Sequence, residues 1–213
     1  MQLDHLCYVA GPEGLGACVQ RLGSRLGAGF SDGGIHPRLG TRNYVLPLAD
    51  GRYLEVVAAL DHPAADSAPF GRAVRNRTLS GGGWLGWVVR VDDISDIELH
   101  LARPAADGHR VRPDGYDLRW KQLGVNDTAA NPHIPFFVQW LSPFSEHPSS
   151  HGSAISLTRL EISGDQSTID QYLGSSSDAI LADIDVTWLP VSEDDNGIIA
   201  AEFATAHGTV RID

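Results

Sequence analysis

Among the side chains of the first 55 residues that could carry protons or bind a metal, we single out His5, His36 and Glu55. A carboxylate inside an apolar strand is costly to bury unless a cation or several donors meet it, so Glu55 is the strongest local sign of function. Two imidazoles and a carboxylate can bind non-haem iron or zinc, and either Glu55 or His36 can act as a general base. The alternatives are a Glu55 paired with Arg42, a His36 that hydrogen-bonds a loop, and a His5 satisfied inside the sheet.

Four further side chains are candidates for binding a small molecule: Asn43, Arg119, Gln139 and Trp140. Asn43 and Gln139 each carry a donor and an acceptor, which suits carbonyl or amide groups. An inward Arg119 could hold a carboxylate through two parallel hydrogen bonds, and the alternative is a solvated Arg119. Trp140 alternates with Gln139, so a regular strand turns only one of them inward.

The composition argues against large anionic partners. The chain has 213 residues with 16 Lys and Arg against 27 Asp and Glu, and its formal net charge of -11 repels nucleic acid and anionic membranes. No run of residues reaches the length of a membrane span. Cys7 and Cys18 lack the spacing of a redox or zinc motif, so we expect two buried thiols in a cytoplasmic protein with a small-molecule partner.

The elements that must position these groups begin with an alternating strand at 3–9 and an amphipathic helix at 14–26. Extended segments follow at 30–36, 41–48 and 53–58, and the last two are joined by Asp50-Gly51, a strong hairpin signal. Alternation places His5 on one side with Leu3 and Cys7, and Asp4 on the other side. The order is strand, helix and three strands.

The same order returns twice, which predicts an α+β fold of repeated βαβββ modules. We expect one domain over 1–213, with a first module at 1–60, a second at 84–142 and a third, weaker one at 154–213. A connector carries one short helix near 68–74. A second connector, 142–153, is typical of a solvated surface loop, which we favour over a metal site built from His133, His147 and His151.

Several short motifs in the first 142 residues carry a family resemblance. They are Leu3-Asp4-His5-Leu6, Gly33-Gly34-Ile35-His36-Pro37, Gly40-Thr41-Arg42-Asn43, Tyr53-Leu54-Glu55-Val56 and Pro135-Phe136-Phe137-Val138-Gln139-Trp140. In order and spacing they resemble the glyoxalase-like branch of the vicinal oxygen chelate (glyoxalase/bleomycin resistance/dioxygenase) superfamily. The resemblance implies paired modules whose mixed sheet curls into a cup, with helices on its outer face and the reactive site inside.

The resemblance also implies a chemistry. His5 and Glu55 fall on the metal-ligand positions of the first module, with His36 as a third ligand, whereas Gly86 and Gln139 stand at the second module's positions and are poor ligands. The expected function is an isomerase, lyase or dioxygenase acting on a vicinal-oxygen or enolisable carbonyl compound. A divalent zinc, iron, manganese or nickel ion could assist it, and the cup could be completed within one chain or in a homodimer. The alternative is a non-catalytic protein that sequesters a small molecule, as in antibiotic resistance.

Overall fold

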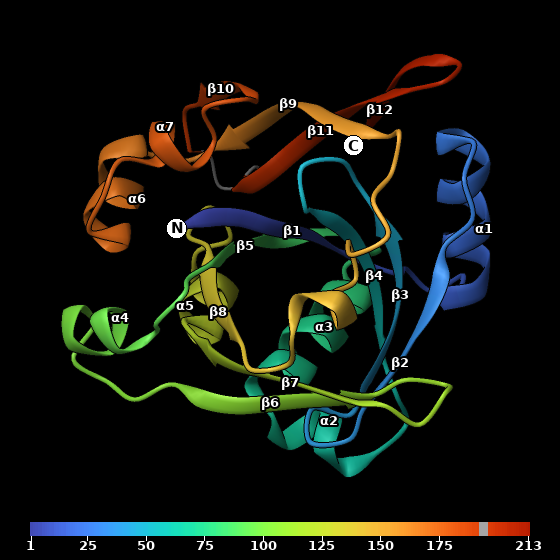
Figure 1. Cartoon of the computed structure of the whole chain (residues 1–213), viewed down its shortest axis with the longest axis horizontal. Coiled ribbons are helices and arrows are strands. Elements are labelled where there is room, and N and C mark those ends of the chain that lie inside the picture. The colour runs from blue at the N-terminus through green and yellow to red at the C-terminus, as the bar shows by residue number, and fades with distance from the viewer. Residues whose placement is uncertain (192–195) are drawn as a thin grey trace.

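Eight strands close into a barrel in the computed structural model, which describes residues 1–191 and 196–213 (Figure 1). Their order around the barrel is β1-β4-β3-β2-β6-β7-β8-β5. The strands are β1 (Gln2–Val9), β2 (Ser31–His36), β3 (Thr41–Pro47), β4 (Tyr53–Ala59), β5 (Gly83–Arg90), β6 (Ala106–Val111), β7 (Asp117–Leu123) and β8 (Phe136–Trp140). The predicted mixed α+β fold with a curled sheet is confirmed, and the curl goes as far as closure.

The first half of the barrel follows the predicted element order. Helix α1 (Leu15–Leu26) ends at Gly27, whose left-handed backbone closes the last turn, and buries Cys18 and Leu22. Strand β4 pairs in parallel with β1 and antiparallel with β3. The hairpin between β3 and β4 turns at Asp50 and Gly51, with φ angles of 61° and 71°. Two adjacent positive φ angles are what a tight hairpin requires, so the Asp-Gly prediction is confirmed.

The second half has the same pairing, because β5 pairs in parallel with β8 and β7 lies between β8 and β6. Helix α4 (Ser95–His100) follows β5, and the short helix α5 (Val125–Ala130), which the sequence did not predict, lies between β7 and β8 along the chain. The halves join through a long β1–β5 ladder and through a single registered pair, Ile35 with Val111, between β2 and β6. The description of these halves as repeated modules stays a prediction.

The remaining strands form a separate sheet in the order β10-β9-β11-β12. They are β9 (Ser156–Ser163), β10 (Asp185–Leu189), β11 (Gly197–Thr205) and β12 (Gly208–Ile212), with α6 (Gln166–Leu173) and α7 (Ser177–Ile180) after β9. The order of strands and helices is as predicted, but the parallel pairing differs from that in the barrel. β9 pairs in parallel with β10, the next strand along the chain, whereas β1 pairs in parallel with β4, three strands later. Leu160, Ile162 and Phe203 share one apolar core with the outer face of β1 and β5.

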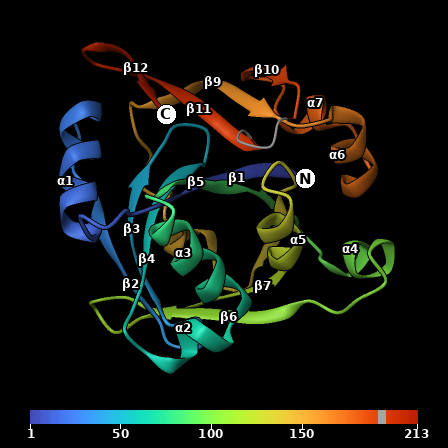
Figure 2. The ribbon, with the colours of Figure 1, turned by 180° about the vertical axis from the view of Figure 1, so that it is seen from behind.

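Both ends of the barrel are covered (Figures 1 and 2). Helix α3 (Pro69–Leu79), which follows the short α2 (Pro63–Ser67), lies across one end, and its Phe70 and Val74 enter the interior core. Residues 141–155, here called the closing segment, cross the other end and contain the 3-10 turn η1 (Phe144–Glu146). Helices therefore cover an end of the barrel as well as its outer face. Across the described ranges, we find no helix both long and apolar enough for a membrane span.

Candidate functional site

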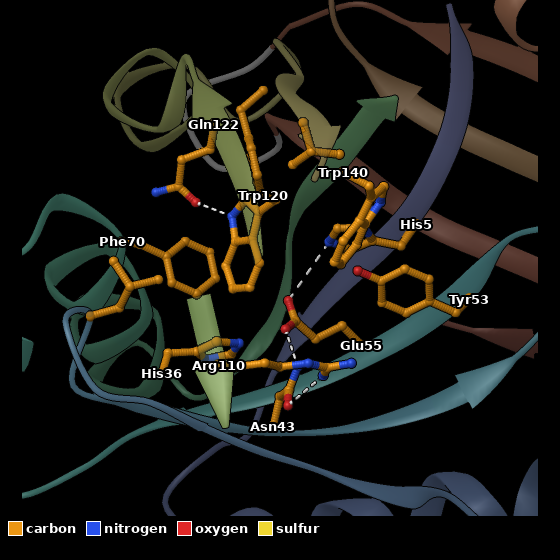
Figure 3. Close-up of a pocket in the computed structure, with 13 residues that line it drawn as sticks. His5, His36, Asn43, Tyr53, Glu55, Phe70, Arg110, Trp120, Gln122 and Trp140 are labelled. Atoms are coloured by element: carbon orange, nitrogen blue, oxygen red, sulfur yellow. Dashed lines mark hydrogen bonds and ion pairs between the residues drawn. The ribbon is translucent and has the colours of Figure 1, made fainter. Parts of the chain in front are cut away.

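The barrel interior holds a pocket with one polar and one aromatic wall (Figure 3). Strands β1 to β4 and β6 supply the polar wall: His5, His36, Asn43, Glu55 and Arg110. The aromatic wall comes from α3, β7 and β8: Phe70, Trp120, Phe136 and Trp140. The cavity measures about 30 Å³, room for one or two waters. A larger ligand requires movement of the aromatic side chains or of the closing segment.

Glu55 lies on β4 with its side chain inside the barrel and is 5% exposed. Its Oε1 accepts a hydrogen bond from Asn43 Nδ2 at 2.6 Å, and its Oε2 accepts one from Cys7 Sγ at 3.2 Å. Burial by itself raises the pKa of Glu55, but the neighbouring imidazoles and these two donors outweigh it and lower the pKa. Glu55 is therefore a carboxylate at neutral pH. The alternative partner Arg42 pairs with Asp32 instead.

His5 faces Glu55, but by a different geometry from the predicted one. The ladder between β1 and β5 shifts register between Leu3 and His5, so Asp4 is bulged. Leu3 packs in the outer core, and Asp4 joins His5 on the inside. The expectation that Asp4 points away from His5 is therefore wrong, since it assumed a regular strand.

Asp4 is fully buried and holds His5 in place. Its Oδ2 lies 2.8 Å from His5 Nδ1, and its Oδ1 lies 3.2 Å from both His147 Nε2 and Trp140 Nε1. Burial raises the pKa of Asp4, but hydrogen bonds from His147 and His5 hold it far below its usual range. A carboxylate beside Nδ1 assigns the proton to that nitrogen and leaves His5 Nε2 facing Glu55 Oε2, 3.8 Å away.

His147 corrects the prediction of a solvated loop at 142–153. Its side chain is 2% exposed and lies against Asp4, Tyr53 and Trp140, so the closing segment is anchored inside the barrel mouth. Ser149 N donates to His147 Nδ1 at 3.2 Å, which leaves Nε2 protonated to donate to Asp4. The sequence offered no sign of this contact, because its partner lies on the first strand.

His36 lies on β2 and lines the pocket opposite Trp120, with ring centroids 5.7 Å apart. Its Nδ1 is 2.8 Å from Thr41 Oγ1. Burial lowers the pKa of His36 to about 4, so the ring is neutral at pH 7. The pKa of Glu55 is lowered as well, so both predicted bases are weak, and Glu55 is preferred because it carries a negative charge and its Oε2 faces His5 Nε2.

Arg110 is the principal functional candidate that sequence reasoning missed. It lies on β6, is 3% exposed, and donates through Nη1 to Asn43 Oδ1 at 3.0 Å. The only available signal was its place in the predicted extended segment at 109–112. Its inward direction depends on the register of β6 against β7, in which Arg110 pairs with Leu118.

The predicted binding residues divide between the two faces of the barrel. Asn43 and Trp140 line the pocket, although the indole N–H of Trp140 is already bonded to Asp4. Arg119 has a 67% exposed side chain and pairs with Asp117 at 2.8 Å. Gln139 binds backbone groups at the start of α4.

The predicted correspondence of Gln139 with Glu55 is wrong by one residue. Phe136 and Val138 face the pocket on β8, and Gln139 faces outward. A strand has a period of two, so an offset of one residue turns the side chain to the other face.

The side chains around the pocket do not fit a divalent metal. No group of three His, Cys, Asp or Glu side chains in residues 1–191 and 196–213 is arranged to hold one. Both oxygens of Glu55 accept protein hydrogen bonds, and the buried cation Arg110 adjoins the site. The second half of the barrel, which the structure describes in full, contributes no His, Cys, Asp or Glu to the lining, and the amide oxygen of its Gln122 already accepts from Trp120 Nε1. Metal binding by His5, His36 and Glu55 stays a prediction that this geometry does not favour.

Comparison with known proteins supplies the family. Residues 3–172 match the family model described as a glyoxalase-like domain. The chain belongs to that family. The match confirms the resemblance drawn from the short motifs of this glyoxalase-like protein, and it reaches past the barrel into α6. No curated protein matches the chain in sequence.

Solved structures give likenesses of fold at low sequence identity. A hypothetical protein from Staphylococcus aureus aligns at 13% identity with a TM-score of 0.62, covering 100% of this chain and 85% of that one. Methylmalonyl-CoA epimerase from Mycobacterium tuberculosis aligns at 14% identity with a TM-score of 0.43, covering 67% and 89%. The Streptomyces coelicolor epimerase in complex with 2-nitronate-propionyl-CoA aligns at 13% identity with a TM-score of 0.45, covering 66% and 93%. The first likeness supports the fold of this glyoxalase-like protein.

Proposed function

We propose that this glyoxalase-like protein is an enzyme that moves a proton at the carbon next to a carbonyl group of a small molecule. The observation that carries this proposal is the state of Glu55, a buried carboxylate on the cavity wall whose pKa is lowered by its neighbours. A deprotonated carboxylate on the wall of a small interior cavity is placed to act as a general base. The reaction class is that of an isomerase or lyase acting on an enolisable compound.

The proton transfer can be written on the residues of the pocket. Glu55 takes the proton from the carbon, the C–H electron pair forms the carbon–carbon double bond of an enolate, and the carbonyl electron pair moves onto oxygen. Arg110, on the same wall of the pocket, supplies positive charge that stabilises the negative charge developing on the substrate. His5 Nε2 lies 3.8 Å from Glu55 Oε2, so the two groups could exchange the proton once a small side-chain movement or a bridging water brings them within hydrogen-bond reach. Asp4 keeps His5 in the orientation that this exchange needs.

Exchange of carbon-bound hydrogen with deuterium oxide tests the proposal directly. We would follow the proton NMR signals of pyruvate and of hydroxyacetone, which present an anionic and a neutral enolisable group, with the wild type and the Glu55→Gln variant. Catalysed exchange that disappears in Glu55→Gln supports the proposal. Glu13→Gln is the matched control, because Glu13 is exposed in the turn before α1 and pairs with Arg21. Exchange by Glu55→Gln at the wild-type rate would reject Glu55 as the base.

The second candidate function, binding without chemistry, draws on the aromatic wall. Phe70, Phe136, Trp120 and Trp140 could enclose a planar ligand, and the second half of the barrel contributes no acid or base there. Saturable binding of hydroxyacetone or pyruvate with no deuterium exchange would favour this second function.

Metal analysis of protein purified without chelators tests the prediction that zinc, iron, manganese or nickel binds. Stoichiometric metal in the wild type that is lost in His5→Ala and Glu55→Gln would restore that prediction.

Two expectations drawn from the sequence stay predictions. A homodimer would show as twice the chain mass of 22.9 kDa by light scattering. A cytoplasmic location is consistent with the two free, buried cysteines, Cys7 and Cys18.

A further inference from the structure

Arg110 is a buried cation that forms no salt bridge in the described part of the chain, although Glu55 and Asp32 favour its charge from a greater distance. Its one hydrogen bond goes to the neutral amide of Asn43, and its Nε is buried without a partner. Arg52 is a useful comparison, because it is similarly buried but pairs with Asp183 at 2.6 Å. A buried charge is costly unless it is paired at close range, and burial lowers the pKa of Arg110 despite the more distant carboxylates of Glu55 and Asp32, so an anion in direct contact would stabilise it.

The nearest acid is held at a distance by Asn43. The Asn43 amide donates to Glu55 through Nδ2 and accepts from Arg110 through Oδ1, so it lies between the two charges (Figure 3). Arg110 and Glu55 form no ion pair in the ranges that the structure describes. The remaining N–H groups of Arg110 are therefore left for a ligand in the pocket, beside the proposed base.

Gly33 on β2 makes the room for this arrangement. A Cβ at position 33 would lie 2.1 Å from Asn43 Oδ1 and 2.4 Å from Arg110 Nη1. The Asn43–Arg110 pair therefore packs directly on the backbone of β2, where any side chain would displace it. A guanidinium fixed in this way offers a preorganised fork, the geometry that matches the two oxygens of a carboxylate.

We propose that Arg110, positioned by Asn43 and Gly33, binds a carboxylate of the substrate, which is therefore a small acid such as a 2-oxo acid. The inference rests on the proposed function for the place of the reacting carbon, which would lie between this carboxylate and Glu55. The binding of a carboxylate by Arg110 does not depend on the proposed reaction. The cavity of about 30 Å³ limits the acid to a few heavy atoms unless the pocket widens.

Oxalate and oxamide are matched probes, since both are small and planar and only oxalate is charged. Calorimetry should show saturable oxalate binding by the wild type and none by oxamide, with oxalate raising the melting temperature. Arg110→Met should weaken oxalate binding at least about tenfold. Arg119→Met is the control, because Arg119 is exposed and paired with Asp117. Its oxalate affinity should equal that of the wild type.

The thermal stability of the Arg110 variants distinguishes an arginine that serves to bind a ligand from one that serves to hold the fold together. Methionine removes the buried charge but leaves Asn43 Oδ1 without its donor, so the melting temperature of Arg110→Met should fall by no more than a few degrees. Should Arg110→Met fail to fold, Arg110→Lys keeps the charge without the fork and should still bind oxalate less tightly than the wild type. Equal affinity in either Arg110 variant, equal binding of oxamide, or no saturable oxalate binding by the wild type would overturn the proposal.

The two proposals can fail separately. Glu55→Gln should still bind oxalate, because it leaves Arg110 in place. Loss of deuterium exchange in Glu55→Gln with unchanged oxalate affinity in Arg110→Met would sustain the proton transfer and reject the carboxylate subsite. Oxalate binding that depends on Arg110, without exchange on either carbonyl compound, would sustain the subsite and reject the reaction.

Discussion

The Asn43 amide donates to Glu55 Oε1 at 2.6 Å, and its other end accepts from Arg110. One neutral side chain thereby adds to the effect of the imidazoles of His5 and His36 in keeping Glu55 charged, and it separates Glu55 from Arg110. Neither partner is near Asn43 in the sequence: Glu55 is 12 residues away and Arg110 is 67 residues away.

Asn43→Leu should therefore destabilise the protein at neutral pH. The substitution removes a short hydrogen bond from a buried charge, and we expect the free energy of unfolding to fall by about 1–3 kcal/mol. Urea denaturation measures the change. Asn126→Leu, at an exposed position on α5, is the control and should change stability by less than about 0.5 kcal/mol. Wild-type stability in Asn43→Leu would mean that Glu55 does not depend on this donor.

Glu55→Gln should remove catalysis while sparing the fold. The glutamine keeps the shape of the side chain but cannot accept the proton, so the exchange rate should fall by a factor on the order of 10²–10⁴. The same variant should keep a cooperative urea transition, which shows that the loss is chemical. A fall of less than about twofold would assign the base to another group.

Acid should weaken the protein through His36 before its carboxylates titrate. Burial lowers the pKa of His36 from its usual 6.5 to about 4, so the unfolded chain binds the proton first. This contribution is complete above pH 6.5 and is lost as the pH falls toward 4. Between pH 7.5 and 5, the loss should be roughly 2 kcal/mol. His36→Gln should lack this component in urea denaturation at the two pH values, and equal pH dependence in both proteins would contradict the assignment.

Asp4→Asn should loosen the mouth of the barrel as well as the pocket. The new amide turns N–H groups toward the donors His5, His147 and Trp140, so we expect a loss of about 2–4 kcal/mol in the free energy of unfolding. Hydrogen exchange of the closing segment should accelerate at the same time. Asp92→Asn, at an exposed position, should leave both measurements unchanged. Unaltered protection of residues 141–155 would show that Asp4 does not anchor them.

Gly33→Ala should displace the Asn43–Arg110 pair. The added methyl group would overlap Asn43 Oδ1 and Arg110 Nη1, so the variant should lose about 1–3 kcal/mol of stability by overpacking and should bind oxalate more weakly. Gly16→Ala is the control, because a Cβ at that helical position meets nothing within 4 Å. Calorimetry with oxalate checks the affinity, and an unchanged value would mean that the pair tolerates the displacement.

Local sequence information was sufficient for the element order and for part of the site. Hydrophobic periodicity, the Asp50-Gly51 turn and the glycines after α1 act within a few residues of themselves, so the strands and most helices were predictable. Simple alternation correctly placed Glu55 inside the sheet, between the outward Leu54 and Val56. The short motifs pointed to the correct family for the same reason, since they lie on these strands.

Tertiary structure alone decided which groups meet inside the barrel. The bulge at Asp4 arises from pairing with β5, and it turns a residue inward that alternation places outside. The faces of Arg110, Arg119 and Gln139 depend on the registers of β6, β7 and β8, where one residue of offset reverses the direction of a side chain. The contact of His147 with Asp4 spans 143 residues, a distance over which no local pattern carries information.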